Sequence, residues 1–141
     1  MKPTIYILLL SLIFLASCSG SDKNIEFSII RDILQDIQIS FNQRELDKIL
    51  SYYHPDFLHK GKNIYAITND WQHYMNTYLE LNIEIIDLDI RDYEAIARIK
   101  ITWKDQNHTY PPYIDPETRG EMSYFYKEHR DWKIIGNGNP E

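Results

Sequence analysis

His54 and Asp56, on either side of Pro55, are the residues of this chain that come closest to an acid–base pair. An imidazole can accept a proton near neutral pH, and a neighbouring carboxylate can hold it in the required orientation. The same side chains can equally serve structure, by capping a helix end or by pairing with each other. A general base also needs a shifted pKa, which residue order does not encode, so both interpretations remain open.

The rest of the chain contains no established catalytic or metal-binding motif. The five histidines are scattered, without the i, i+4 spacing of a zinc-binding helix and without carboxylates at ligand spacing. The five glycines are too dispersed for a phosphate-binding loop or a nucleophile elbow. The sequence therefore predicts neither a metal site nor a cofactor.

The single cysteine, Cys18, follows a short apolar segment at the start of the chain. A lysine precedes this segment, residues 5–14 are apolar except for one serine, and the small residues Ala16 and Ser17 lead into the cysteine. This arrangement resembles the lipobox of bacterial lipoproteins. The resemblance implies that residues 1–17 are a signal peptide and that Cys18 becomes the acylated N-terminus, anchored in membrane lipid.

The apolar segment is about half as long as the roughly 20 residues that a transmembrane helix needs, which favours a lipid anchor over an uncleaved helical one. Residues 18–23 are then the lipidated cysteine and a short polar tether. Ser19 stands where some bacteria use an aspartate to retain lipoproteins in the inner membrane, so the outer membrane is slightly favoured. We expect the domain to lie in the bacterial cell envelope, outside the cytoplasm.

The chain is acidic, with a formal net charge of −6 that becomes one unit more negative when Lys2 is removed. An acidic surface without a basic cluster argues against nucleic acid and against electrostatic binding to anionic lipid headgroups. With Cys18 committed to lipid, no thiol remains for a disulfide, a metal or a nucleophile.

Hydrophobic spacing predicts helices in the first half of the chain. A helix capped by Asn24 places one apolar stripe on a single face, at Ile30, Ile33, Leu34, Ile37 and Phe41. A second helix covers residues 46–53 and ends before Pro55. An extended segment that turns at Gly61 follows, and a third helix begins at one of residues 68–70.

Alternating apolar residues predict strands in the second half, over residues 81–90, 95–104, 121–128 and 132–135. The first of these changes phase, so we expect a bulge near Ile85 that turns Ile86, Leu88 and Ile90 toward the core. Between the strands, residues 105–120 form a long loop whose three prolines disfavour a regular strand. Such a loop is either a lid or contact surface, or a surface insertion.

Helices followed by a curved antiparallel sheet resemble the nuclear transport factor 2-like superfamily, which includes ketosteroid isomerases and polyketide-cyclase-like proteins. The likeness is carried by residues 41–50 (FNQRELDKIL), 53–57 (YHPDF) and 132–135 (WKII), within a single domain over residues 24–138. It implies an α+β, cystatin-like cone, in which three helices pack on a curved, mostly antiparallel sheet. It also implies a cavity at the open end, and dimers through the outer sheet face are frequent.

Six aromatic residues are the candidates for the wall of that cavity. The third helix contributes Trp71, Tyr74 and Tyr78, and the strands contribute Trp103, Tyr124 and Tyr126. Aromatic residues at helical spacing usually pack in a core, and that alternative applies to most of them.

The resemblance to ketosteroid isomerases makes Asp87 a candidate proton shuttle, if its carboxylate points into the cone. The strand phase argues otherwise, because Asp87 faces outward when Leu88 faces the core. A one-residue slip would reverse this assignment.

Together these features predict an envelope lipoprotein that binds a small molecule or a partner through its aromatic cavity or loop and does not catalyse a reaction. One alternative is an isomerase or dehydratase that acts on a small carbonyl compound through His54, Asp56 or Asp87. Another is a structural accessory subunit that uses its sheet face to form a homodimer or to bind an envelope protein.

Overall fold

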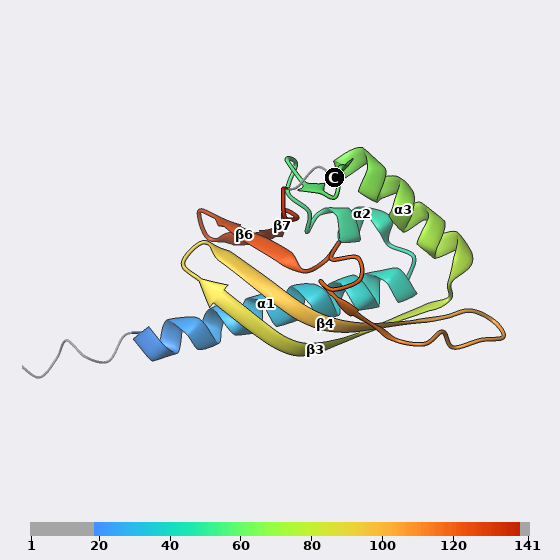
Figure 1. Cartoon of the computed structure of the whole chain (residues 1–141), viewed down its shortest axis with the longest axis horizontal. Coiled ribbons are helices and arrows are strands. Elements are labelled where there is room, and N and C mark those ends of the chain that lie inside the picture. The colour runs from blue at the N-terminus through green and yellow to red at the C-terminus, as the bar shows by residue number, and fades with distance from the viewer. Residues whose placement is uncertain (1–18, 139–141) are drawn as a thin grey trace, which may run out of the picture.

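The computed structural model describes residues 19–138, so Cys18, the predicted signal peptide at 1–17 and residues 139–141 lie outside the described part. Three helices are followed by a mostly antiparallel sheet (Figure 1), which confirms the predicted α+β class. Within residues 19–138, no helix is long and apolar enough to cross a membrane.

The first helix, α1 (Ser19–Asn42), carries the predicted apolar stripe. Residues 19–23, expected to be a tether, are helical, and Asp22 in the first turn suits the positive end of the helix dipole. All five predicted stripe residues are buried: Ile30, Ile33, Leu34, Ile37 and Phe41. The 3.6-residue period therefore identified the face of α1 that meets the sheet.

The turn after α1 also holds the end of the third helix, α3 (Ile64–Thr77). Arg44 has a left-handed backbone, with φ of 65°, which stops α1. Its guanidinium donates to the carbonyl oxygens of Met75 and Tyr78, each at 2.8 Å. These bonds satisfy carbonyls that the last turn of α3 leaves unpaired.

A short helix and a tight hairpin connect α1 to α3. The helix α2 (Leu46–Leu50) leads to β1 (Leu58–His59) and β2 (Lys62–Asn63), which pair antiparallel. Lys60 and Gly61 both have positive φ, as a two-residue hairpin turn of type I′ requires, and the turn predicted at Gly61 is confirmed. The Asn63 side chain accepts the Ala66 N–H at 3.1 Å, so α3 begins earlier than the predicted cap at residues 68–70.

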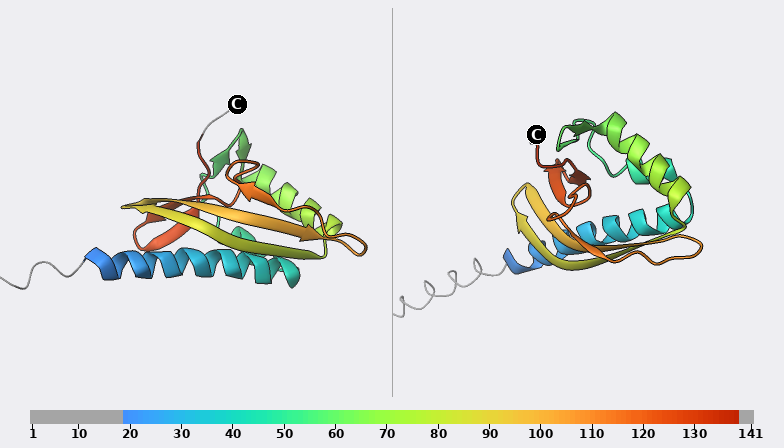
Figure 2. Two further views of the ribbon diagram at one scale, coloured as in Figure 1. Left: turned by 60° about the horizontal axis from the view of Figure 1, so that its bottom comes forward. Right: turned by 45° about the vertical axis from the view of Figure 1, so that its right-hand side comes forward.

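The main sheet has five strands: β3 (Glu80–Arg91), β4 (Glu94–Lys104), β5 (Tyr113–Asp115), β6 (Tyr124–Glu128) and β7 (Asp131–Ile134). Their order is β3-β4-β6-β7, and β5 also pairs with β4. The strand β5 lies within the loop expected to be irregular, because the three residues between Pro112 and Pro116 are free to pair. Figure 2 shows the strands, α1 and α3 arranged around one interior.

The long strand β3 contains the predicted bulge. Its register against β4 shifts between Ile85 and Asp87, which leaves Ile86 as the extra residue. Ile86 is 43% exposed, so its predicted core-facing orientation is wrong, whereas Leu88 and Ile90 pack against the core. The bulge keeps the apolar residues on both sides of it on the inner face.

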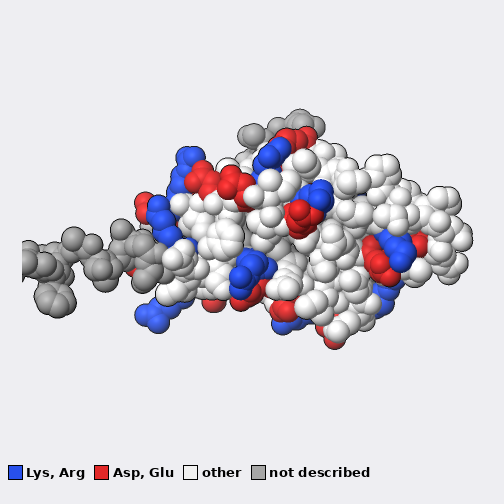
Figure 3. All heavy atoms as spheres, turned by 90° about the horizontal axis from the view of Figure 1, so that it is seen from below, with Lys and Arg blue, Asp and Glu red and all other residues white. Residues whose placement is uncertain are grey.

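Several ion pairs lie on the outer face of the sheet. Lys100 pairs with Glu84, Lys104 with Glu80 at 3.3 Å, and Arg98 with Glu117 at 2.6 Å. The view along the β3 edge shows acidic and basic groups in small mixed clusters rather than in a patch of one sign (Figure 3). The outer face therefore combines ion pairs with exposed apolar side chains, at Ile86, Ile96 and Tyr126.

A half-buried charge cluster links α1 to the β6–β7 hairpin. The Glu26 carboxylate accepts hydrogen bonds from Lys127 Nζ and from the Trp132 indole N–H. Burial alone would raise the pKa of Glu26, but these two hydrogen bonds and the Lys127 charge outweigh it and hold the pKa below its ordinary value of 4.5.

We expect this cluster to give the fold an acid-sensitive contribution to stability. Because the folded-state pKa of Glu26 lies below the unfolded one, the contribution is complete above about pH 5 and is lost as the pH falls through the depressed value. Glu26→Gln should therefore flatten the fall in unfolding free energy between about pH 5 and pH 3. Glu45→Gln, an exposed change, should leave that slope intact; equal slopes in Glu26→Gln and the parent would contradict the assignment.

Candidate functional site

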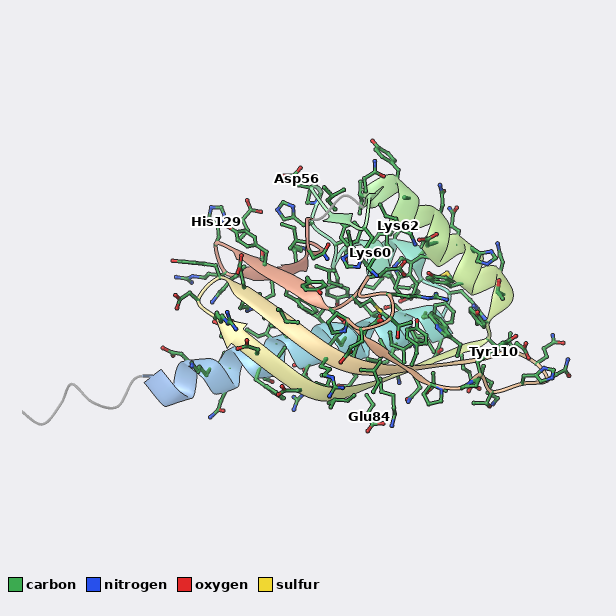
Figure 4. The ribbon with its side chains drawn as sticks, in the orientation of Figure 1. Asp56, Lys60, Lys62, Glu84, Tyr110 and His129 are labelled. Carbon is green, nitrogen blue, oxygen red and sulfur yellow. The ribbon has the colours of Figure 1, made fainter. Side chains whose placement is uncertain are left out.

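A cavity of about 370 Å³ lies between α3, the β1–β2 hairpin and the segment that follows β5. Its lining combines charged groups with aromatic rings: His59, Lys60, Lys62, His73, Tyr74, Tyr78, Thr118, Arg119 and Glu121. Lys60 and Lys62 lie beside the start of α3, whereas Tyr110 lies near the other end of that helix (Figure 4), where its ring packs edge-on against Tyr78 at 5.3 Å. A larger hollow of about 450 Å³ lies between α1 and β3 and includes Asp87, but the cavity beside α3 is the one that brings cationic, acidic and aromatic side chains together, so it is the candidate site.

Aromatic rings fill the interior behind this cavity. The Trp103 ring is stacked on Tyr78 with a centroid distance of 4.8 Å and contacts Tyr74 at 5.2 Å. Trp71 lies against Trp103 at 6.4 Å and Phe41 against Trp103 at 5.2 Å. Trp71 and Trp103 are buried core residues that do not line the cavity, while Tyr74 and Tyr78 form its wall.

Glu121 is the carboxylate that lines the cavity, and donors hold both of its oxygens. Lys62 Nζ lies 2.7 Å from Oε1, and the Tyr74 hydroxyl donates to Oε2 at 3.0 Å. Lys62 also contacts Asp70 at 2.6 Å. Burial, together with the negative charge of Glu121, raises the pKa of Tyr74 far above its usual value, so its hydroxyl stays protonated.

Arg119 also lines the cavity, and it stands at the end of the hydrogen-bonded series Lys62, Glu121, Tyr74, Arg119. Its Nη1 donates to the Tyr74 hydroxyl at 3.0 Å, and its guanidinium lies 5.5 Å and 5.3 Å from the ring centroids of Tyr74 and Tyr113. The Trp103 indole N–H donates to the Tyr113 hydroxyl at 3.2 Å, and burial raises the pKa of Tyr113 to about 12. The guanidinium is therefore held by two rings and one hydroxyl.

The backbone around Arg119 is fixed from two sides. Asp115 is buried and accepts the Arg119 N–H at 2.7 Å, and burial raises the pKa of its carboxyl. The His59 ring contacts the Arg119 carbonyl oxygen through Nε2 at 2.5 Å and accepts the Asn137 N–H through Nδ1 at 3.4 Å. In this arrangement Nε2 is the donor to the carbonyl oxygen, and the ring holds the loop in place.

His54 lies outside the cavity lining and has structural partners. Its Nδ1 accepts the Asp56 backbone N–H at 3.0 Å, and its Nε2 lies 3.3 Å from Glu128 Oε2. The Asp56 side chain is 89% exposed and lies 4.0 Å from the imidazole. These contacts close the turn after α2 against β6, and neither side chain lines the cavity beside α3.

Three further candidates also lie away from the cavity lining. Asp87 is exposed beside the bulge, on the outward side that the strand phase indicated. Tyr124 packs on His59 at 5.5 Å, and Tyr126 meets the His54 ring edge-on at 6.4 Å. The six aromatic candidates thus divide into two core residues, two cavity residues and two residues on β6.

The charged half of the cavity, which is made by Lys60, Lys62, Arg119 and Glu121, was not predicted from the sequence. Lys62 and Glu121 are 59 positions apart, so no local motif links them. The feature of the sequence that pointed to this region was the long loop at residues 105–120. Its length, three prolines and two tyrosines indicated a lid or contact surface as one of its two possible roles. Its last residues, Thr118 and Arg119, do form part of the cavity.

In the part of the chain that the structure describes, no group of three or more His, Cys, Asp or Glu side chains is arranged to hold a metal ion. The cavity's chemistry therefore consists of one hydrogen-bonded carboxylate, three cationic side chains, two imidazoles and two phenols. This combination can bind and orient a small polar molecule.

Comparison with known proteins identifies the fold. No protein-family model matches the chain, and no curated protein is a significant match. Among solved structures, Bd1075 of Bdellovibrio bacteriovorus is similar with a TM-score of 0.64 and 12% identity, over 84% of this chain. This chain spans only 42% of Bd1075.

Two similar structures match over most of their own length. A nuclear transport factor 2-like protein of unknown function from Shewanella oneidensis has a TM-score of 0.63 and 16% identity, over 79% of this chain and 95% of that one. A putative scytalone dehydratase from Novosphingobium aromaticivorans has a TM-score of 0.59 and 13% identity, over 82% and 84%. The chain therefore has the nuclear transport factor 2-like fold that its helix and strand order predicted.

Proposed function

We propose that this protein is a bacterial envelope lipoprotein that binds a small molecule in the cavity between α3 and residues 118–121, without changing it chemically. The observation that carries the proposal is the cavity itself, whose volume of about 370 Å³ suits a small organic molecule. Tyr74 and Tyr78 provide an apolar wall, and a few charged groups converge at the mouth.

The contacts of Glu121 suit a fixed binding group. Lys62 and the Tyr74 hydroxyl each donate to one of its oxygens, so the carboxylate is held in one orientation at the cavity wall. The three residues nominated for catalysis, His54, Asp56 and Asp87, are not among the lining residues. A site of this kind is preorganised to orient a ligand.

Blocking the cavity tests the proposal. We expect Thr118→Trp to fill the mouth, because Thr118 is exposed and lines the cavity, and to reduce binding of small aromatic fragments at least tenfold. NMR titration of the full chain in detergent should place fragment-induced amide shifts at residues 59–62, 73–78 and 118–121. Asn76→Trp, an exposed change on α3 outside the lining, should bind as the parent does; shifts confined to other surfaces would contradict the proposal.

The lipid anchor is a separate part of the proposal, supported by the lipobox-like residues before Cys18. We expect Cys18→Ala to abolish acylation, and either to release the chain from the membrane or to leave its signal peptide uncleaved. Ser17→Ala, which keeps a small residue before the cysteine, should fractionate with the parent. Membrane partitioning and mass unchanged in Cys18→Ala would contradict the anchor.

An isomerase or dehydratase is the second candidate function, and one contact favours it. The Tyr74 hydroxyl donates to the Glu121 carboxylate at 3.0 Å inside the cavity, and the phenol could polarise a substrate carbonyl if its one O–H turned from Glu121 to that oxygen. One similar structure is named as a putative scytalone dehydratase. Loss of turnover in Tyr74→Phe, measured on small hydroxy-carbonyl compounds, would favour this candidate over binding alone.

A further inference from the structure

We infer that the cavity takes a small organic molecule carrying a carboxylate, which the Arg119 guanidinium binds. The inference rests on the proposed binding function and adds the chemical class of the ligand. Its first support is local charge. The chain as a whole is acidic, with a net charge of −6, yet the cavity is lined by Lys60, Lys62 and Arg119 against the single carboxylate of Glu121.

The Lys62 charge is already compensated. Its ammonium lies 2.6 Å from Asp70 and 2.7 Å from Glu121, so two carboxylates share one cation. The same contacts hold Glu121 in place and reduce its repulsion of an incoming anion. Lys62 therefore builds the site but is not the group that remains available to a ligand.

Arg119 is not in direct contact with a carboxylate, although the Glu121 charge lies beyond Tyr74. Within residues 19–138, no carboxylate lies within 4.0 Å of its guanidinium nitrogens, and its side chain is bonded to the Tyr74 hydroxyl only. The Tyr74 and Tyr113 rings, within 5.5 Å of the guanidinium carbon, fix its plane. Since a guanidinium has five N–H donors in a rigid fork, four are left for a planar, bidentate acceptor.

Lys60 adds a second positive charge at the mouth. Its ammonium reaches only the Thr118 carbonyl oxygen, at 3.5 Å, and the side chain is exposed. The cavity thus offers the oriented guanidinium of Arg119 and the flexible ammonium of Lys60, with the carboxylate of Glu121 nearby. Because that carboxylate repels negative charge, the site suits a monoanion better than a multiply charged phosphate. The rings of Tyr78 and His73 along the same cavity favour an apolar, ring-bearing body on that anion.

Two probes of the same shape test the ligand class: 2-naphthoate, which carries a carboxylate, and its neutral amide, 2-naphthamide. We expect the full chain in detergent to bind 2-naphthoate at least tenfold more tightly than 2-naphthamide, by NMR titration of the amides that line the cavity. Arg119→Met, which keeps the aliphatic contact with the rings, should abolish this preference. Arg130→Met, an equal loss of charge in the exposed β6–β7 turn, should keep it.

If Arg119→Met does not fold, the preference for 2-naphthoate over 2-naphthamide can be measured in Arg119→Lys. It retains the charge but not the planar fork, so the preference should fall without vanishing. Equal affinity for the two probes in the parent would overturn the inference and leave the proposed binding function standing. Binding of neither probe would count against both, and a preference undiminished in both Arg119 variants would overturn the role of Arg119.

Discussion

Gly136→Ala is expected to destabilise the protein by about 3 kcal/mol, because an added methyl group meets two separate obstacles. Gly136 has φ of +80°, a left-handed conformation that costs an L residue about 1 kcal/mol. A Cβ atom there would also lie 2.8 Å from the His59 Cβ and still nearer the Leu58 carbonyl oxygen. Because the nearest atoms belong to the Leu58 backbone, they cannot move aside as the end of a flexible side chain could.

A second glycine separates the two costs. Gly61 has a similar φ of +74°, but a Cβ atom there would have no neighbour within 4 Å. Gly61→Ala should therefore lose only the conformational cost, about 1 kcal/mol. Chemical denaturation of the two variants and the parent measures the difference, and equal losses would show that the close approach of residue 136 to β1 contributes nothing.

The Gly136 variant should also disturb the cavity. His59, which the new methyl group would contact, holds the Arg119 carbonyl oxygen at 2.5 Å. A displaced His59 ring would release the segment that carries Arg119. We therefore expect amide shifts at residues 118–121 in any folded fraction of Gly136→Ala and not in Gly61→Ala.

Trp103→Ala is expected to cost about 3–5 kcal/mol of unfolding free energy, a large part of what a domain of this size possesses. The indole is 3% exposed and packs against four other aromatic rings, from Phe41, Trp71, Tyr74 and Tyr78. Its N–H also donates to the Tyr113 hydroxyl. Removing the ring would leave a cavity at the centre of the aromatic cluster.

Thermal or chemical unfolding of two control variants checks this prediction. Trp103→Phe keeps a ring and loses the hydrogen bond to Tyr113, so its loss should be clearly smaller, about 1–2 kcal/mol. Tyr65→Ala removes an aromatic ring that is 78% exposed and should change stability by less than about 0.5 kcal/mol. A Trp103→Ala protein as stable as Tyr65→Ala would mean that the cluster is not the core.

Substitution of Trp103 is not a clean test of ligand binding. A variant that lacks Trp103 would lose a ligand through collapse of the wall behind the cavity, even though the ring does not line it. Exposed lining positions, such as Thr118, report on the cavity without removing core packing.

The fold could be predicted wherever a periodic pattern decided the structure. The stripe on α1 and the alternation along β4 each record one buried face, and both were identified from spacing alone. The bulge in β3 was visible as a change of phase, although Ile86 proved to be its outward residue. The start of α3 was misplaced because Asn63, Thr68, Asn69 and Asp70 can all cap a helix, and the hairpin geometry selects the first.

The cavity could be predicted only in its aromatic half. Tyr74 and Tyr78 follow helical spacing, but the same spacing also produced Trp71, which is in the core. The charged half depends on the β1–β2 hairpin meeting the segment after β5, a contact between residues about 60 positions apart. A contact between residues so far apart in the sequence cannot be predicted from a local pattern.

Native mass spectrometry of the chain, extracted gently from the membranes of its own host, tests the central claim most directly. We expect a reproducible additional non-covalent mass that is lost on denaturation, is retained in Asn76→Trp and is missing from Thr118→Trp. The same spectrum reports whether Cys18 carries lipid, so the anchor is read independently of the ligand. A chain without any bound small molecule, or a mass that Thr118→Trp retains in full, would contradict the account.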